Sequence, residues 1–185
     1  MNKKCLIIVD YQKDFYHPDG NLYVPGGETI QENIEKIIPE FDDVIFTYDW
    51  HPSNHCSFNV NGGTWPVHCV RGTEGATVPK SMIELAKRFH VVYKGMDATK
   101  EEYGAFMPNT AASDLLSEFT DYEVVVCGLA GNFCVLETLK NVCNIIDPSN
   151  VKVYMDGIKF IEIGDDYTSS FLELAHVYNL KNYND

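Results

Sequence analysis

Positive charge is scarce in this chain of 185 residues, and long apolar runs are absent. Lys and Arg together number 14 against 27 Asp and Glu, which gives a formal net charge of −13. Nucleic acids and anionic membranes bind through clustered basic side chains, so this balance disfavours both as partners and favours a small-molecule substrate. No apolar run is long enough to cross a bilayer.

The chain also lacks a recognisable signal peptide, internal repeats, low-complexity stretches and linkers. Its first apolar run, at 5–9, is too short and wrongly flanked for export, so a cytoplasmic location is the default expectation. A length of 185 residues suits one compact domain with a full core, and we expect a single domain over 1–185.

The six cysteines are expected to be free thiols, because disulfides are rare in a chain of this length without an export signal. Cys5 and Cys127 lie in apolar runs and are predicted to act as small core residues.

Strand-like and helix-like segments alternate along the chain. Short apolar runs predict strands at 5–10, 43–48, 90–94, 123–127 and 151–156, and helical spacing predicts helices at 30–38, 81–89, 112–119, 134–142 and 168–178. This alternation predicts an α/β fold with a mostly parallel sheet covered on both faces. The irregular stretch at 52–79 is long for a compact domain, and loops of that length are often functional.

Cys134 follows a predicted strand and a Gly-rich turn, at the start of a predicted helix. The unpaired N–H groups and the positive dipole end of a helix N-terminus both favour a thiolate. Asp10, Asp49 and Lys94 fall at the carboxyl ends of other predicted strands, where sites gather in parallel sheets. We therefore expect these side chains to converge.

The long loop carries a group of candidate metal ligands. Asp49 and His51 are two residues apart, so an extended backbone points both side chains the same way, and His68 adds a second imidazole. One carboxylate and two imidazoles suit Zn, Fe or Mn and leave positions open, as in catalytic sites. His55 or Ser57 is a candidate for an additional contact, directly or through water. The neighbouring Cys56 and Cys69 are alternative ligands, although thiolate-rich sites are usually closed and structural.

These residues occur in an ordered set of motifs that resembles the nicotinamidase/pyrazinamidase branch of the isochorismatase-like cysteine hydrolases, from about residue 4 to at least residue 140. The motifs are Asp10-Tyr-Gln12-Lys-Asp14-Phe15, Val24-Pro-Gly-Gly27, Asp49-Trp-His51-Pro-Ser-Asn-His55-Cys-Ser57-Phe58, Trp65-Pro-Val-His68-Cys69-Val-Arg-Gly-Thr73-Glu-Gly-Ala76, Lys94-Gly, Tyr103-Gly-Ala-Phe106 and Gly128-Leu-Ala130 followed by Cys134-Val. Each motif alone is weakly specific, whereas all of them in order are highly specific.

The resemblance implies a three-layer α/β/α fold and a metal-dependent amidohydrolase that converts nicotinamide to nicotinic acid and ammonia through a thioester, in NAD salvage. Pyrazinamide is a further expected substrate, zinc is the favoured metal with iron or manganese as alternatives, and both monomers and homo-oligomers are compatible with the family.

The resemblance also implies a role for each matching residue. Asp10, Lys94 and Cys134 would form the catalytic triad, with Asp49, His51 and His68 as metal ligands. A cis peptide is expected before Ala130, whose N–H would form an oxyanion hole with that of Cys134. Phe15 and Trp65 match positions that flank the substrate ring, although Phe15 is equally typical of a core aromatic.

Two departures from the family pattern stand out. Gly131-Asn132 replaces a frequent Thr-Asp, with an expected effect on the pocket floor, and 144–163 matches poorly. Two other functions stay open: an amidase of the same family acting on a carbamoyl or ureido compound, and a non-catalytic metal-binding or thiol-redox module. The second leaves Asp10 and Lys94 without a role.

Overall fold

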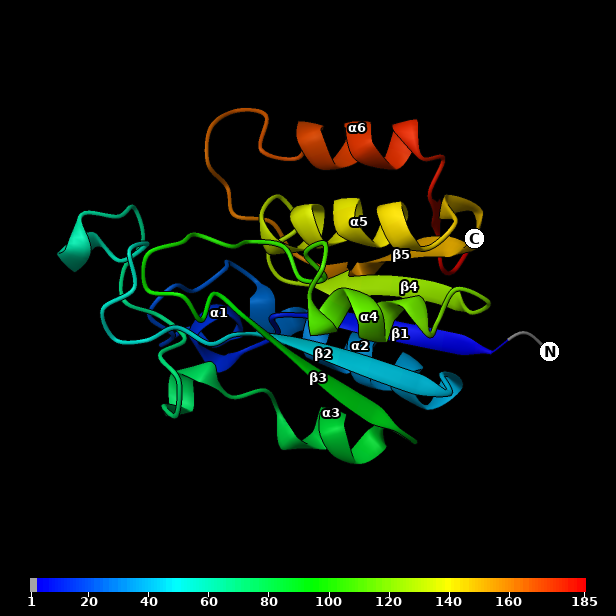
Figure 1. The fold of residues 1–185 in the computed structure, drawn as a ribbon, viewed down its shortest axis with the longest axis horizontal. Coiled ribbons are helices and arrows are strands. Elements are labelled where there is room, and N and C mark those ends of the chain that lie inside the picture. The colour runs from blue at the N-terminus through cyan, green and yellow to red at the C-terminus, as the bar shows by residue number, and fades with distance from the viewer. Residues whose placement is uncertain (1–2) are drawn as a thin grey trace.

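A computed structural model describes residues 3–185 and contains a six-stranded sheet in the order β3-β2-β1-β4-β5-β6 (Figure 1). The strands are β1 (Lys4–Val9), β2 (Asp43–Asp49), β3 (Phe89–Lys94), β4 (Glu123–Gly128), β5 (Val151–Ile158) and β6 (Lys181–Asn182). Every neighbouring pair is parallel, with Leu6 opposite both Val44 and Val125 in the centre.

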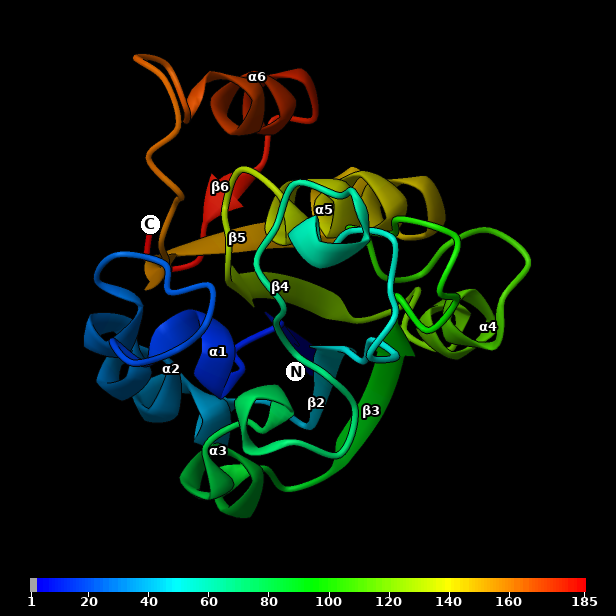
Figure 2. The same ribbon diagram turned by 90° about the vertical axis from the view of Figure 1, so that its left-hand side faces the viewer.

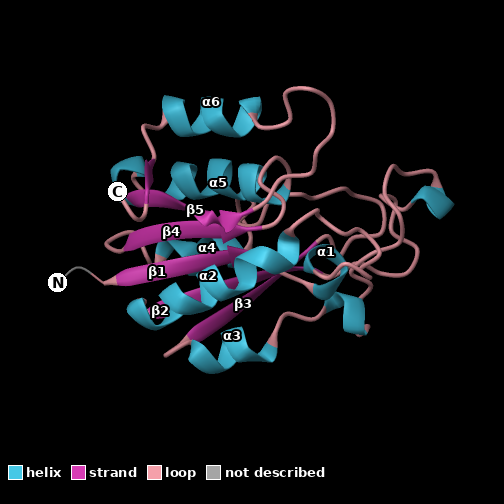
Figure 3. Cartoon of the chain, turned by 180° about the vertical axis from the view of Figure 1, so that it is seen from behind, coloured by secondary structure: helices cyan, strands magenta, loops and turns pink. Residues whose placement is uncertain are grey.

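Helices cover both faces of this sheet (Figure 2). One face carries α1 (Lys13–Tyr16), α2 (Gln31–Ile37) and α3 (Lys80–Leu85), and the other carries α4 (Ala111–Ser117) and α5 (Cys134–Ile145). The last helix, α6 (Ser169–Val177), lies outside α5 rather than on the sheet (Figure 3). The predicted three-layer α/β/α architecture is confirmed. None of the described helices is long and apolar enough to cross a membrane.

The burial of the strands explains their sequences. β1 and β4 occupy the middle of the sheet, and both are buried on both faces, which accounts for their uninterrupted apolar runs. Cys5 and Cys127 are fully buried within them, as predicted, and all six thiols are free. β3 lies at the edge, where Val92 and Lys94 point inward and the alternate residues are exposed.

The order in which the chain adds strands to the sheet reverses between β1 and β4. From β1 the chain continues outward to β2 and β3, and then returns to β4 beside β1 before continuing to β5 and β6. In parallel α/β sheets the crevice beyond the carboxyl ends at such a reversal is the usual place for a ligand site. Asp10 follows β1 directly, and Cys134 follows the turn after β4.

Most predicted elements are present, with corrections at short ones. The helix predicted at 81–89 is shorter in the structure: α3 ends at Leu85, and Phe89 belongs to β3. The sequence analysis missed α1 and β6, which have four and two residues and are too short to show a periodic pattern.

Candidate active site

Asp10 is held at the carboxyl end of β1 by its neighbour strand. Its backbone adopts a left-handed conformation with φ 45°, and its N–H donates to both the carbonyl oxygen and Oγ1 of Thr47, each at 3.2 Å. The Thr47 hydroxyl donates back to Asp10 Oδ1 at 2.6 Å. The carboxylate is fully buried, so its second oxygen, Oδ2, is directed at the interior of the site.

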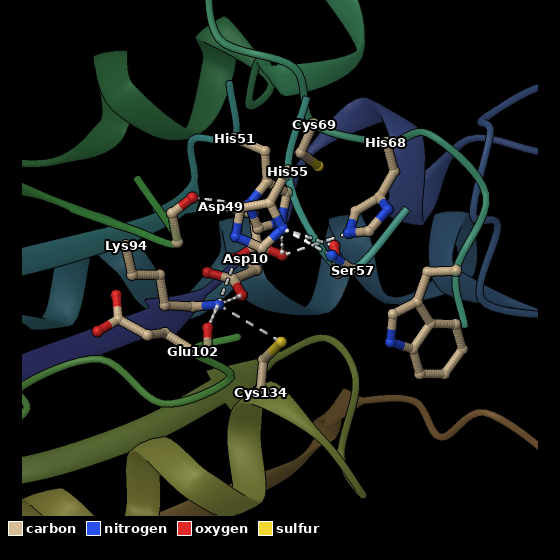
Figure 4. Close-up of polar contacts among 12 residues, drawn as sticks. Asp10, Asp49, His51, His55, Ser57, His68, Cys69, Lys94, Glu102 and Cys134 are labelled. Carbon is tan, nitrogen blue, oxygen red and sulfur yellow. Dashed lines mark hydrogen bonds and ion pairs between the residues drawn. The ribbon is translucent and has the colours of Figure 1, made fainter. Parts of the chain in front are cut away.

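Lys94 joins the other groups of the site (Figure 4). Its Nζ lies 2.8 Å from Asp10 Oδ2, 2.5 Å from Asp49 Oδ1 and 3.6 Å from Cys134 Sγ. Burial opposes its charge, but the carboxylates of Asp10 and Asp49 raise the pKa of Lys94 well above its ordinary value. Lys94 is therefore a buried ammonium shared by two carboxylates and a thiol.

Cys134 is the first residue of α5 and is 6 % exposed. Burial raises the pKa of its thiol well above the ordinary value; Lys94 lowers this pKa, whereas Asp10 and Asp49 raise it. Burial and two neighbouring carboxylates therefore act against the thiolate that the helix N-terminus was expected to favour. These surroundings favour the thiol form of Cys134.

The turn before Cys134 presents two backbone donors. The peptide between Leu129 and Ala130 is cis, as the resemblance implied. Ala130 O accepts from the N–H groups of Phe133 and Val135, which fixes the turn. Within residues 3–185, the N–H groups of Ala130 and Cys134 donate to no acceptor. Both are therefore available to a ligand beside the thiol.

Asp49, His51 and His68 form a group whose ligand atoms all lie within 4.8 Å of one another. Nε2 of His51 is 3.4 Å and Nε2 of His68 is 3.8 Å from the same oxygen, Asp49 Oδ2. Their Nδ1 atoms face the carbonyl oxygens of Gly95 at 2.8 Å and Pro66 at 2.7 Å. A carbonyl can only accept, so each Nδ1 carries a proton, and each Nε2 is the ring nitrogen that faces the carboxylate.

This arrangement fits a divalent transition metal. Two imidazole lone pairs and a carboxylate oxygen converge in a buried place, and the outer ring nitrogens are already oriented by backbone acceptors. Burial opposes the charge of Asp49, but Lys94 and His51 hold the pKa of its carboxyl well below the usual range. Burial lowers the pKa of His68, which keeps that ring neutral and able to coordinate.

His55 and Ser57, the two candidates for an additional metal contact, do not belong to the group formed by Asp49, His51 and His68. The His55 ring stacks on His51 at a centroid distance of 4.1 Å. Its Nδ1 lies 2.7 Å from Ser57 Oγ, and its Nε2 lies 3.0 Å from Lys100 O. His55 and Ser57 thus bond to each other, and the second nitrogen of His55 bonds to the backbone. His55 packs against the His51 ring, and Ser57 holds His55 in place.

Gln12 is a site residue to which the sequence analysis assigned no function. Its Oε1 accepts the N–H of Asp49 at 2.8 Å, and its Nε2 donates to Asp49 O at 2.8 Å and to Ala76 O at 3.0 Å. The side chain is fully buried. Gln12 therefore fixes the backbone of a metal-ligand candidate, and only its position in the first motif pointed to it.

A pocket opens onto these groups. Its walls include both predicted aromatics, Phe15 and Trp65, together with Leu22, Asp49, His68, Glu101, Tyr103, Ala130, Phe133, Cys134 and Ile161. Trp65 Nε1 donates to the hydroxyl of Tyr103 at 2.9 Å, which orients the indole. The pocket thus combines flat apolar walls with a polar end that holds the thiol and the metal-ligand candidates.

The departure at Gly131-Asn132 shapes this pocket. A Cβ at Gly131 would meet the ring of Phe160 at 2.5 Å, so this close approach requires glycine. Asn132 Nδ2 donates to Ile161 O at 2.8 Å, and Asn132 Oδ1 accepts from Ile161 N–H at 3.0 Å. Because Ile161 lines the pocket, part of the poorly matching stretch 144–163 belongs to the site wall.

The isochorismatase domain pattern matches residues 4–145 of the chain, which includes every triad and metal-ligand candidate. The chain belongs to the isochorismatase family. Among similar proteins, the nicotinamidase of Acinetobacter baylyi is 31% identical over 94% of this chain and 89% of its own.

Two solved structures are similar to this isochorismatase family member over nearly its whole length. A protein from L. infantum in complex with nicotinate superimposes with a TM-score of 0.82 at 30% identity, over 98% of this chain and 92% of its own. The pyrazinamidase of Pyrococcus horikoshii in complex with zinc gives a TM-score of 0.80 at 30% identity, over 97% and 98%.

Proposed function

We propose that this protein is a nicotinamidase: a metal-dependent cysteine amidohydrolase that releases ammonia from nicotinamide. The observation that carries the proposal is the position of Lys94 Nζ, within 3.6 Å of a buried thiol and within 2.8 Å of two buried carboxylates, one of which faces two imidazoles. A nucleophile, a base and a candidate metal site therefore share one pocket with aromatic walls. Relatives named nicotinamidase support this substrate.

In the proposed reaction, Asp10 accepts the proton of the Cys134 thiol, and the sulfur attacks the amide carbon. Burial raises the pKa of Asp10 while Lys94 opposes that rise, which makes the carboxylate a stronger base than an exposed one. Lys94 stabilises the charged state of the pair. The N–H groups of Ala130 and Cys134 would receive the oxyanion, an effect of about 3 kcal/mol per donor.

The intermediate then collapses, and the protonated Asp10 returns its proton to the leaving nitrogen as ammonia departs. This leaves a thioester on Cys134. A water molecule that loses its proton to Asp10 attacks the thioester carbon, and the acid leaves as the thiol is re-formed. Asp10 thus acts in both halves of the reaction.

Asp49, His51 and His68 would hold the metal beside the pocket, with zinc favoured over iron or manganese. When bound, a divalent metal supplies a Lewis acid that can accept the pyridine nitrogen of the substrate or lower the pKa of a water. The side chains of Phe15 and Trp65 would flank the ring from either side of the pocket. Pyrazinamide, a ring of the same size, is a second proposed substrate. We also propose a cytoplasmic role in NAD salvage.

An amidase acting on carbamoyl or ureido compounds is the second candidate. Such substrates need not contain an aromatic ring, whereas the pocket has an aromatic wall. The Phe133 ring centroid lies 5.1 Å from that of Trp65 and 5.6 Å from that of Tyr103. A non-catalytic metal-binding module would give the buried triad no role. Both alternatives are therefore less well supported.

The test measures ammonia released from nicotinamide by the wild type, Cys134→Ala and Cys143→Ala. Cys143 is a matched control because it is another buried cysteine of α5. We expect Cys134→Ala to lose about 10⁴-fold or more in kcat and Cys143→Ala to stay within a few-fold of wild type. Near wild-type turnover in Cys134→Ala would rule out the mechanism.

A second arm removes the metal with a chelator and then restores Zn²⁺, Fe²⁺ or Mn²⁺ separately. We expect turnover to fall on removal and return with one or more of these ions. A third arm compares nicotinamide with aliphatic amides and ureido compounds, and preference for these compounds would favour the second candidate.

A further inference from the structure

The outer border of the sheet carries an exposed apolar stripe on β3. Phe89, Val91 and Tyr93 are 49 %, 37 % and 45 % exposed. Their alternate neighbours Val92 and Lys94 are buried, so all three exposed side chains lie on one face of the strand. Trp50, directly after β2, extends the stripe, and its ring centroid lies 4.8 Å from that of Tyr93.

The same three residues leave their backbone unpaired. Val44 N–H donates to Arg88 O, and Trp50 N–H donates to Lys94 O, so the even-numbered residues of β3 direct their backbone groups toward β2. The N–H and C=O groups of Phe89, Val91 and Tyr93 therefore face outward from the sheet. β3 is the last strand on this side of the sheet (Figure 2).

An uncovered apolar edge strand is a hazard that proteins usually reduce with a charge, a proline or a bulge on the edge. β3 has none of these on its outward positions 89, 91 and 93. Its edge is thus suited to pairing with another strand.

We propose that β3 pairs antiparallel with β3 of a second copy of this chain, around a two-fold axis at Val91. In that register Val91 faces its own equivalent, and Phe89 of each copy faces Tyr93 of the other. These are the residues whose N–H and C=O groups point outward, so all three positions form the pairs that exchange hydrogen bonds. The apolar stripes of the two copies join into one surface across the axis.

Charge supports a second copy in this orientation. The exposed Lys87 precedes β3 and forms no ion pair among residues 3–185, whereas Arg88 is already paired with Asp43. The exposed Asp97 follows β3, so the strand has a basic end at Lys87 and an acidic end at Asp97. Antiparallel pairing brings the basic end of each copy beside the acidic end of the other, whereas parallel pairing would bring like charges together. Asp97 accepts from Thr99 and contacts no cation among residues 3–185.

The first test measures oligomeric state by sedimentation velocity from micromolar to hundreds of micromolar protein. We expect a concentration-dependent dimer for the wild type and a monomer for Val91→Lys, because two ammonium groups would meet at the axis. Val177→Lys is the matched control, since Val177 is 69 % exposed on α6, away from β3. Circular dichroism and thermal unfolding verify that each variant is folded, independently of any enzymatic activity.

The second test checks the register by oxidising Val91→Cys and Phe89→Cys beside the wild type. Facing residues in a hydrogen-bonded antiparallel pair have Cα atoms about 5.5 Å apart, within the disulfide range. The two copies of position 89 would be four residues apart along the strand, about 14 Å. We expect a covalent dimer only for Val91→Cys. A monomeric wild type, a dimer that survives Val91→Lys, or equal cross-linking at both positions would overturn the proposal.

Discussion

The two ends of β2 each bury a carboxylate, and they balance its charge in different ways. At the amino end, Asp43 meets the Arg88 guanidinium at 2.6 Å and His90 at 3.1 Å, with the Arg88 side chain 59 % exposed. At the carboxyl end, Asp49 shares the Lys94 ammonium with Asp10, and all three side chains are at most 6 % exposed. The amino end therefore has a cationic partner for its single carboxylate, whereas the carboxyl end has two carboxylates and one ammonium.

This difference indicates which end does chemistry. A buried excess of negative charge is costly unless a further cation or a proton offsets it. At the carboxyl end, Asp49 Oδ2 faces the two imidazole nitrogens, where a divalent cation would fit, and Asp10 lies beside the thiol that we propose as the nucleophile. The amino end has no such excess and stabilises the start of β2 and β3.

Replacing Lys94, beside the carboxyl end of β2, should have the largest effect on both stability and turnover. We expect Lys94→Met to lower the free energy of unfolding by about 3–5 kcal/mol, because it leaves two buried carboxylates without their cation. Turnover of nicotinamide should fall to background in the same variant. Urea unfolding and ammonia release measure the two effects.

Arg88→Met is the matched control at the amino end. Its guanidinium is largely exposed and screened by solvent, so we expect a much smaller loss of stability than for Lys94→Met and nearly normal turnover. Equal destabilisation by the two substitutions would contradict the distinction between the ends.

Gln12 should show a smaller effect, on metal affinity. Gln12→Leu keeps a similar volume but removes the bonds to the backbone N–H and C=O of Asp49. We expect about 10- to 100-fold weaker Zn²⁺ binding, as is typical when a group that orients a metal ligand is lost. Competition with a chromogenic chelator measures the affinity.

Gln31→Leu is a suitable control for Gln12, because within residues 3–185 the side-chain amide of Gln31 bonds only to Glu35, on the surface of α2. Its Zn²⁺ affinity should equal that of the wild type. Unchanged affinity in Gln12→Leu would mean that the backbone of Asp49 is held by other contacts.

The sequence was sufficient to predict the positions that depend on strand ends and short spacing. Asp10 and Lys94 follow or end apolar runs, and parallel strands bring their carboxyl ends together, so convergence on Cys134 followed from pattern alone. Short elements such as β6 gave no signal. The contacts of Gln12 and Asn132 depend on how loops fold back over the site, which has no local pattern.

The pKa of Cys134 is a property that the sequence alone did not predict. The helix N-terminus was visible in the sequence, and it favours a thiolate. The depth of burial and the second carboxylate were not visible, and they raise the pKa of the thiol. The size of these influences depends on the three-dimensional surroundings of the thiol, which the sequence does not show.

Asp43 should give the smallest effect, and its pH dependence distinguishes a structural carboxylate from a catalytic one. Burial opposes its charge, but hydrogen bonds from Arg88 and His90 lower the pKa of Asp43 below its ordinary value of 3.8. A lowered folded-state pKa contributes stability above the unfolded pKa, and this contribution disappears as pH falls through the folded value. We expect Asp43→Asn to cost about 1 kcal/mol at neutral pH, limited by solvent screening of Arg88. In urea unfolding, the difference from wild type should shrink once the pH falls below 3.8. A difference that stays constant to lower pH would show that the cost of Asp43→Asn comes from packing and not from charge.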